Sequence, residues 1–152
     1  MGVELSADEA WDVVAASHTG IFTSLRRDGM PITVPVWFAV LDRRIYVSGP
    51  ATAKRVVRVR HDPRVSFLVE SGERWAELRA VHVTGRAHIA TEPELLAAVA
   101  AALDAKYAAF RMARSAMPAA TRAHYDVALA TLEIVPDARV LSWDNARLRR
   151  RP

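Results

Sequence analysis

Residues 45–65, IYVSGPATAKRVVRVRHDPRV, contain the succession of elements that decides the fold. A run of strand-forming residues ends at Gly49-Pro50. The pattern then becomes that of a short helix, with Thr52 as the predicted N-cap and Asp62-Pro63 as the stop. Alternating hydrophobic residues return directly afterwards, so the segment is predicted to form a strand, a helix and a second strand.

The sequence on both sides of this segment predicts further short strands. The turn Asp28-Gly29 separates two runs of β-branched and aromatic residues, and Gly85 in a later run predicts a bulge or tight bend. The expected strands cover residues 21–26, 32–40, 45–48, 64–69, 78–90, 129–135 and 139–143. These six or seven strands, with helices between them, predict an α+β, mainly β fold with an antiparallel, barrel-like sheet.

Two longer helices are expected outside the opening segment. The capping-box spacing of Ser6 and Glu9 predicts a helix over residues 10–17. A similar capping pattern at Thr91 predicts a second helix that runs to about residue 110. Residues 118–125 predict a further helical turn or two. The second helix is apolar on more than one face, which predicts burial against the barrel or a second subunit. Its apolar residues are Leu95, Leu96, Val99, Ala102 and Leu103.

Length and composition describe one globular domain over residues 1–152. The chain is 51% hydrophobic and 25% charged, and no apolar run approaches the ~20 residues of a membrane helix. The start lacks the pattern of a secretory signal, so a cytoplasmic location is expected. The absence of cysteine excludes disulfides, thiolate zinc sites and cysteine nucleophiles.

The basic charge does not by itself indicate a nucleic-acid partner. The net charge is +4, but the arginines are scattered except at Arg147, Arg149, Arg150 and Arg151, where a solvated tail is expected. No nucleic-acid-binding motif accompanies them, so nucleic acid is not the expected partner. Lysine occurs only at Lys54 and Lys106, which makes the position of each informative.

The segment 48–55 has the parts of a small anion site. It combines a strand end, hydroxyl groups at Ser48 and Thr52, a helix start, and the cations Lys54 and Arg55. A phosphate group would fit there. The local pattern is equally typical of an ordinary capped helix with a solvated basic face, and both alternatives stay open at this point.

Other chemistry-bearing residues give weaker patterns. The histidines at positions 18, 61, 82, 88 and 124 lack the spacing of a metal site, so no metal is expected. No phosphate-binding glycine loop, dinucleotide fingerprint or nucleophile elbow is present. Trp37 and Trp75 could stack on a ring system, although such residues more often serve as core or dimer contacts.

Two motifs in the predicted order of strands carry a family resemblance. The first is the strand, turn, Lys54 and helix that lead into residues 62–65, Asp-Pro-Arg-Val; the second is Val-His-Val-Thr-Gly-Arg-Ala over residues 81–87. Together they resemble the pyridoxamine 5'-phosphate oxidase-like family of flavin-binding split β-barrels over residues 18–90. The resemblance implies that fold, and an active site at a two-fold dimer interface.

The resemblance also implies roles for individual residues. Lys54 would contact the flavin phosphate, helped by Arg55 and Thr52, and Val47 and Ser48 would border the phosphate and the ribityl chain. The end of the second strand, Pro35, Val36 and Trp37, would lie along the isoalloxazine ring. The opposite subunit would contribute Trp75, Arg79 or the stretch near Trp143.

The sequence departs from true pyridoxamine phosphate oxidases. Ala53 stands where those enzymes have an arginine, the apolar Val36 and Val40 stand where they have cofactor-binding cations, and their substrate region has no counterpart. Pyridoxine metabolism is therefore not expected. Short members of the family use FMN or the deazaflavin F420, so the resemblance implies an oxidoreductase that transfers a hydride to a small acceptor. A non-catalytic carrier of flavin or haem on the same barrel is the alternative.

Overall fold

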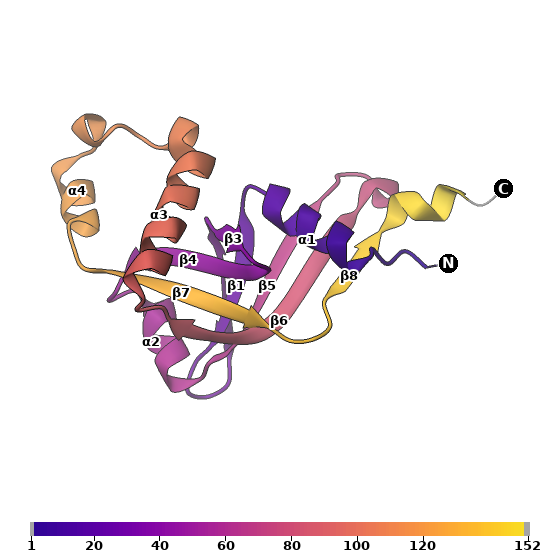
Figure 1. Ribbon diagram of the computed structural model, residues 1–152, viewed down its shortest axis with the longest axis horizontal. Helices are drawn as coiled ribbons and strands as arrows, with labels where there is room; N and C mark the ends of the chain where they lie inside the picture. The colour runs from indigo at the N-terminus through magenta and orange to yellow at the C-terminus, as the bar shows by residue number, and fades with distance from the viewer. Residues whose placement is uncertain (1, 151–152) are drawn as a thin grey trace.

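The computed structural model describes residues 2–150, and within them eight strands form one antiparallel sheet that curls into a barrel (Figure 1). The strands are β1 (Gly20–Leu25), β2 (Pro31–Val36), β3 (Ala39–Leu41), β4 (Arg44–Pro50), β5 (Arg64–Ser71), β6 (Arg79–Ile89), β7 (Leu129–Pro136) and β8 (Leu141–Asp144). Their order is β2-β1-β5-β6-β7-β4-β3, and β8 pairs with β6. The expected mainly β, antiparallel α+β architecture is confirmed.

The expected strand over residues 32–40 is divided in two, which adds one strand to the six or seven expected. β2 ends at Val36 and β3 begins at Ala39, and these two strands occupy opposite ends of the strand order. Trp37 and Phe38 therefore connect the two edges of the sheet through the backbone. The Phe38 N–H donates to the hydroxyl of Tyr107 at 3.0 Å, so at this residue a side chain takes the place of a neighbouring strand.

Helices cover the barrel at several points. They are α1 (Ala7–Ala16), α2 (Lys54–His61), α3 (Pro93–Tyr107) and α4 (Ala119–Tyr125), with single 3-10 turns η1 (Trp75–Glu77), η2 (Ala108–Phe110) and η3 (Arg114–Ala116) and a longer one, η4 (Asn145–Arg150). The predicted capping box of α1 is confirmed. The Ser6 hydroxyl accepts from the Glu9 N–H at 3.3 Å, and the Ser6 N–H donates to the Glu9 carboxylate at 2.8 Å.

The prediction that Thr52 caps α2 is wrong. The N-cap is Ala53, which has extended backbone angles and whose carbonyl accepts from the amides of Val56 and Val57. The chain reaches this position through a turn in which the Ala53 N–H donates to the carbonyl of Pro50. Thr52 lies inside that turn, one residue too early to cap the helix, and no side chain caps it.

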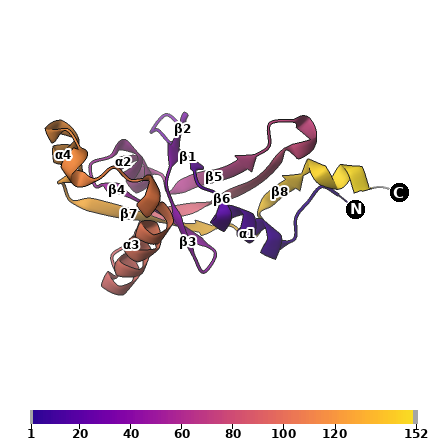
Figure 2. The ribbon, with the colours of Figure 1, turned by 90° about the horizontal axis from the view of Figure 1, so that it is seen from above.

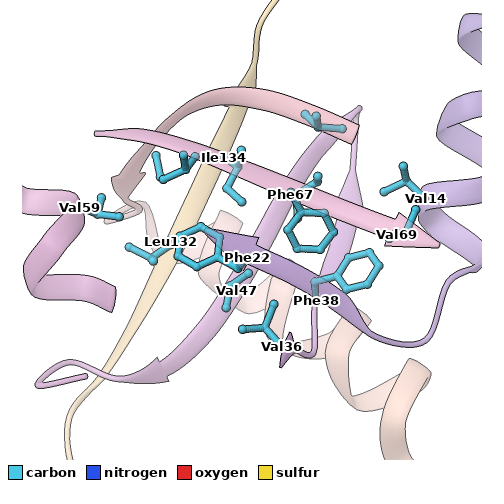
Figure 3. Packing of buried hydrophobic residues seen from close by; sticks show 14 of the residues in the cluster. Val14, Phe22, Val36, Phe38, Val47, Val59, Phe67, Val69, Leu132 and Ile134 are labelled. Carbon is cyan, nitrogen blue, oxygen red and sulfur yellow. The ribbon is translucent and has the colours of Figure 1, made fainter. Parts of the chain in front are cut away.

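The core fills the barrel interior with side chains from alternate strand positions (Figure 3). Phe22 of β1 and Phe67 of β5 are fully buried opposite one another in the register, and Leu132 and Ile134 of β7 complete the layer. Phe38 reaches in from the break between β2 and β3, with its ring centroid 4.8 Å from that of Phe67. Burying each such side chain contributes about 1.5–3 kcal/mol.

Helix α3 buries its apolar residues against the outside of the barrel. Val99, Leu103 and Tyr107 pack with Ala39 of β3 and Tyr46 of β4 in a second hydrophobic cluster. The apolar character of this helix is therefore explained in part by contacts within one chain, as one of the two sequence alternatives proposed.

The two ends of the molecule are formed by different parts of the chain. Helices α3 and α4 lie at one end, while the tip of the β5–β6 hairpin, β8 and both termini lie at the other (Figures 1 and 2). Arg147 at that end is not part of a solvated tail, because its guanidinium donates to the Glu4 carbonyl and to the Glu9 carboxylate, both at 2.7 Å. The side chains of Arg149 and Arg150 lie outside the described part of the chain, and so does the whole of Arg151. Among the helices of residues 2–150, none has the length and apolar character needed to span a membrane.

Of the bulge or tight bend predicted at Gly85, the ladder with β5 contains no bulge, and the residue lies where two strands approach closely. The register of β6 with β5 runs without interruption through Gly85, and the ladder of β6 with β7 begins at this residue, opposite Pro136. A Cβ atom at this position would lie 2.2 Å from the carbonyl oxygen of Val135 and 3.0 Å from Cα of Pro136. Glycine is required because backbone atoms of β7 occupy the space of a side chain.

We expect Gly85→Ala to lower the free energy of unfolding by about 1–3 kcal/mol, because the strand backbone cannot move aside as a flexible side chain would. The thermal midpoint should fall by about 2–4 °C for each kcal/mol. Gly2→Ala is the control, since the nearest atom to its Cβ would be at an ordinary 3.7 Å. Equal midpoints for the two variants would contradict this account of β6 and β7.

Candidate functional site

A cavity of about 770 Å³ lies where β2 and β4 end. This volume is within the ~300–1,000 Å³ usual for cofactor and small-molecule sites. The barrel side of the cavity is lined by Pro35, Val36, Trp37, Val47, Ser48, Gly49, Pro50, Arg55 and Leu129. The outer side comes from α3 and the segment after it: Leu103, Phe110, Arg111, Met112, Arg114, Met117, Thr121 and His124.

The structure brings together most of the residues that the sequence singled out. Those that line the cavity are Pro35, Val36, Trp37, Val47, Ser48 and Arg55. Thr52 and Lys54 are exposed beside the start of α2 and do not line it. Trp75 and Arg79 lie at the β5–β6 hairpin, at the end of the molecule remote from α4 (Figure 2).

Arg55 is the cation of the predicted Lys-Arg pair that reaches the cavity. Its guanidinium lies against Gly49, where a Cβ atom would be 2.1 Å from the Arg55 Nη2. The missing side chain at position 49 therefore provides the space in which the guanidinium lies. In the sequence Gly49 indicated only a turn, so its role beside Arg55 was not predicted.

Ser48 brings a hydroxyl group to the same wall. Its Oγ lies 2.7 Å from Oγ1 of Thr131, its partner across the β4–β7 ladder, and Thr131 is buried. When Thr131 donates in this pair, the Ser48 proton is available to a ligand in the cavity.

The ionisable groups that line the cavity are all basic. Arg55, Arg111, Arg114 and His124 line it, and no Asp or Glu of the described residues does. The acidic partners of two of these arginines, Asp104 for Arg111 and Asp126 for Arg114, lie outside the lining, and such exposed pairs contribute only ~0–1 kcal/mol. The cavity is therefore suited to an anionic ligand.

An aromatic cluster forms the other end of the cavity. The indole of Trp37 is stacked on the ring of Tyr107, with centroids 4.3 Å apart and planes 3° from parallel. The ring of His18 meets Trp37, Tyr107 and Phe110 edge-on, at 5.9, 5.2 and 4.5 Å. Trp37 is 38% exposed and gives the cavity a flat apolar wall.

Lys106 lies behind this wall. Its Nζ donates to the carbonyl of Phe38 at 3.2 Å and lies 3.7 Å from the centroid of the Phe38 ring. Burial lowers the pKa of the Lys106 ammonium to about 8.

Sequence reasoning missed the entire outer wall. Residues 108–118 have no regular hydrophobic period, and they line the cavity together with strand residues far away in the sequence, such as Val36 and Ser48. No local pattern could have identified them.

The chain is similar to a known protein family and to several solved structures. The family model of pyridoxamine 5'-phosphate oxidase matches residues 6–139. The chain belongs to this family. The expected split β-barrel is thereby confirmed. No curated protein matches the chain.

Among solved structures, the conserved hypothetical protein Rv2991 from Mycobacterium tuberculosis is 31% identical, with a TM-score of 0.80. The match covers 99% of this chain and 91% of that one. A FAD-binding protein from Mesorhizobium loti is 21% identical, with a TM-score of 0.68 and coverage of 91% and 93%. HutZ, the heme storage protein from Vibrio cholerae, is 13% identical, with a TM-score of 0.69 and coverage of 94% and 96%. The last two show a shared fold.

The lowered pKa of Lys106 predicts a pH dependence of stability. The folded protein holds this ammonium with a pKa of about 8, against a usual 10.5, so between these values it binds fewer protons than the unfolded chain. The free energy of unfolding should therefore rise with pH across this window, relative to a variant without the amine. Below pH 8 the full cost of burying the charge is present.

Lys106→Met is the comparison, because methionine keeps an unbranched side chain of similar length without a titrating group. We expect the thermal midpoint of the wild type, minus that of Lys106→Met, to become more positive between pH 7.5 and 10. A difference that stays constant across this range would show that the amine titrates normally.

Proposed function

We propose that the chain binds a flavin-type cofactor, FMN or F420, in this cavity and that it works as an oxidoreductase. The observation that carries the proposal is one cavity that joins a cation at Arg55 to a flat aromatic wall at Trp37, with no carboxylate of the described residues in its lining. A phosphate group and a planar ring on one molecule match these two ends. Membership of the family and the FAD-binding proteins of the same fold support the assignment.

Arg55 and Ser48 are proposed to hold the phosphate. A guanidinium and a hydroxyl both donate to phosphate oxygens, and bonds with a charged partner are the stronger kind. The start of α2, which no side chain caps, adds the positive end of a helix dipole beside them. Lys54, exposed next to Arg55, adds a second cation near this end, as the family resemblance implies.

Pro35, Val36 and Trp37 are proposed to lie along the ring. Proline has no N–H to leave unpaired, and Val36 and Trp37 present apolar surface. When bound, the flavin or deazaflavin supplies the hydride transfer to a small acceptor. The chain's own part is to bind the cofactor, orient its ring and exclude water with the apolar outer wall at Phe110 and Met112.

We also propose that two copies of the chain complete the site. Trp75 is 68% exposed at the hairpin tip, and Leu141 and Trp143 are exposed on one face of β8. These residues and Arg79 lie away from the cavity of their own chain (Figures 1 and 2), so they can contribute to a site only in a second copy. Large exposed apolar residues of this kind are typical of an interface.

A second candidate is a non-catalytic carrier of flavin or haem. His124 lines the cavity, where an imidazole could reach a haem iron, and proteins of the same fold include a heme-binding protein from Mycobacterium smegmatis and HutZ. The two candidates differ in turnover and in spectrum.

The cofactor site is tested by titrating purified protein with FMN, F420 and hemin. We expect Arg55→Ala to weaken binding of the phosphate-bearing cofactor about 10- to 150-fold, the equivalent of one charge-assisted bond of about 1.5–3 kcal/mol. Arg60→Ala is the matched control, because Arg60 is exposed on the same helix and does not line the cavity. Lys54→Ala measures the second cation separately. Unchanged affinity in Arg55→Ala would contradict the assignment of the phosphate end.

Gly49→Ala tests the same end without removing a charge. The added methyl group would displace the Arg55 guanidinium, which can rotate away because it is the end of a flexible side chain. We expect weaker cofactor binding at a nearly unchanged thermal midpoint. If cofactor binding weakened and the thermal midpoint fell as well, Gly49 would serve the fold alone.

Turnover then separates the two candidates. Reduction of a small acceptor by cofactor-loaded protein supports the oxidoreductase, whereas tight binding without turnover supports the carrier. A Soret band that is lost in His124→Ala would identify haem as the ligand.

A further inference from the structure

A buried hydroxyl group lies behind the cavity and is not used in the proposed function. It belongs to Tyr107, the last residue of α3, whose side chain is fully buried. Its oxygen accepts from the Phe38 N–H at 3.0 Å and lies 2.7 Å from the carbonyl oxygen of His18 and 3.1 Å from that of Phe38. One hydroxyl proton serves one carbonyl, and Lys106 already donates to Phe38, so we assign the proton to His18.

This one hydroxyl joins three segments that are far apart in sequence. His18 precedes β1, Phe38 lies in the break between β2 and β3, and Tyr107 ends α3. The Phe38 N–H is a buried donor at a place where the sheet offers no partner strand, so the phenolic oxygen satisfies a group that would be costly to leave unpaired.

The ring of Tyr107 acts on the cavity through Trp37. The two rings are nearly parallel and in van der Waals contact, and Trp37 is the residue directly before the anchored Phe38. Trp37 itself lies outside β2 and β3, so no ladder hydrogen bond of those strands holds it. The stacked ring of Tyr107, the anchored neighbour Phe38 and the edge of the His18 ring are therefore the contacts that orient the indole.

We propose that Tyr107 is a positioning residue that holds Trp37 as the flat wall of the cavity. Its hydroxyl fixes the break between β2 and β3, and its ring supports the face of the indole that it covers. Because η2, which ends at Phe110, follows Tyr107 directly, the same anchor also fixes the start of the segment that brings Phe110 to the outer wall. That a cofactor ring lies on Trp37 rests on the proposed function, whereas the positioning of the indole does not.

Fluorine NMR of protein labelled with 5-fluorotryptophan tests the positioning without any ligand. The chain has four tryptophans, and Trp37→Phe identifies the resonance of Trp37. We expect Tyr107→Phe, which removes only the oxygen atom, to shift or broaden this resonance and to leave the other three in place. Spectra are recorded well below the thermal midpoint of each variant, so that global unfolding does not contribute.

Tyr46→Phe is the matched control. Tyr46 is buried in the same cluster under α3, and none of the contacts described above involves its hydroxyl. It should leave the Trp37 resonance unchanged. An unchanged Trp37 resonance in Tyr107→Phe, or the same change in all four resonances, would overturn the proposal, since the second result describes a merely structural role.

Binding gives the second readout. Where the wild type binds FMN, Tyr107→Phe should weaken FMN about fivefold, the value of one ordinary hydrogen bond, while competition by inorganic phosphate stays at the wild-type level. If the binding of FMN and of inorganic phosphate weakened equally, or if neither changed, the link from Tyr107 to the end of the cavity at Trp37 would be overturned. Failure of the wild type to bind FMN would instead remove the proposed function, and the NMR result would still decide whether Tyr107 positions Trp37.

Discussion

The whole arrangement depends on the break in the backbone at Trp37 and Phe38. β2 and β3 are consecutive in sequence yet form the two edges of the sheet, so the barrel is closed there by covalent bonds and not by a ladder. A closed ladder would leave no opening, whereas this junction exposes the ends of β2 and β4 side by side. The cavity lies at that opening, and one of its walls is the residue at the break.

Most strands and the first helix could be predicted because their signals are local. Alternation with a period of two marks the strands, and a capping box needs only residues within one turn of each other, as at Ser6 and Glu9. The break inside residues 32–40 could not be predicted, because the group that accepts from the Phe38 N–H there is a hydroxyl from Tyr107, distant in sequence. The close contact at Gly85 could not be predicted either, since the strand that crowds it comes much later in the chain.

In the candidate site, too, some residues could be predicted from local sequence signals and others could not. The barrel-side residues follow from the strand ends and the family resemblance, but the choice between Lys54 and Arg55 depends on where α2 begins. Each residue along a helix turns the side chain by about 100°, so a start at Lys54, with Ala53 as the cap, decides which cation faces the cavity. The outer wall has no local signal at all, because long-range packing brings it over the barrel.

The cation at this site is matched to its surroundings by shape as well as by charge. A guanidinium is planar and rigid, and its Nη2 enters the space of a missing neighbouring side chain, as that of Arg55 does at Gly49. A lysine ammonium would be a point charge on a flexible chain and would gain little from that space. Gly49 and Arg55 therefore act as one unit. The proposed anion-binding end therefore depends on a glycine of β4 that contributes no chemistry of its own as well as on the arginine.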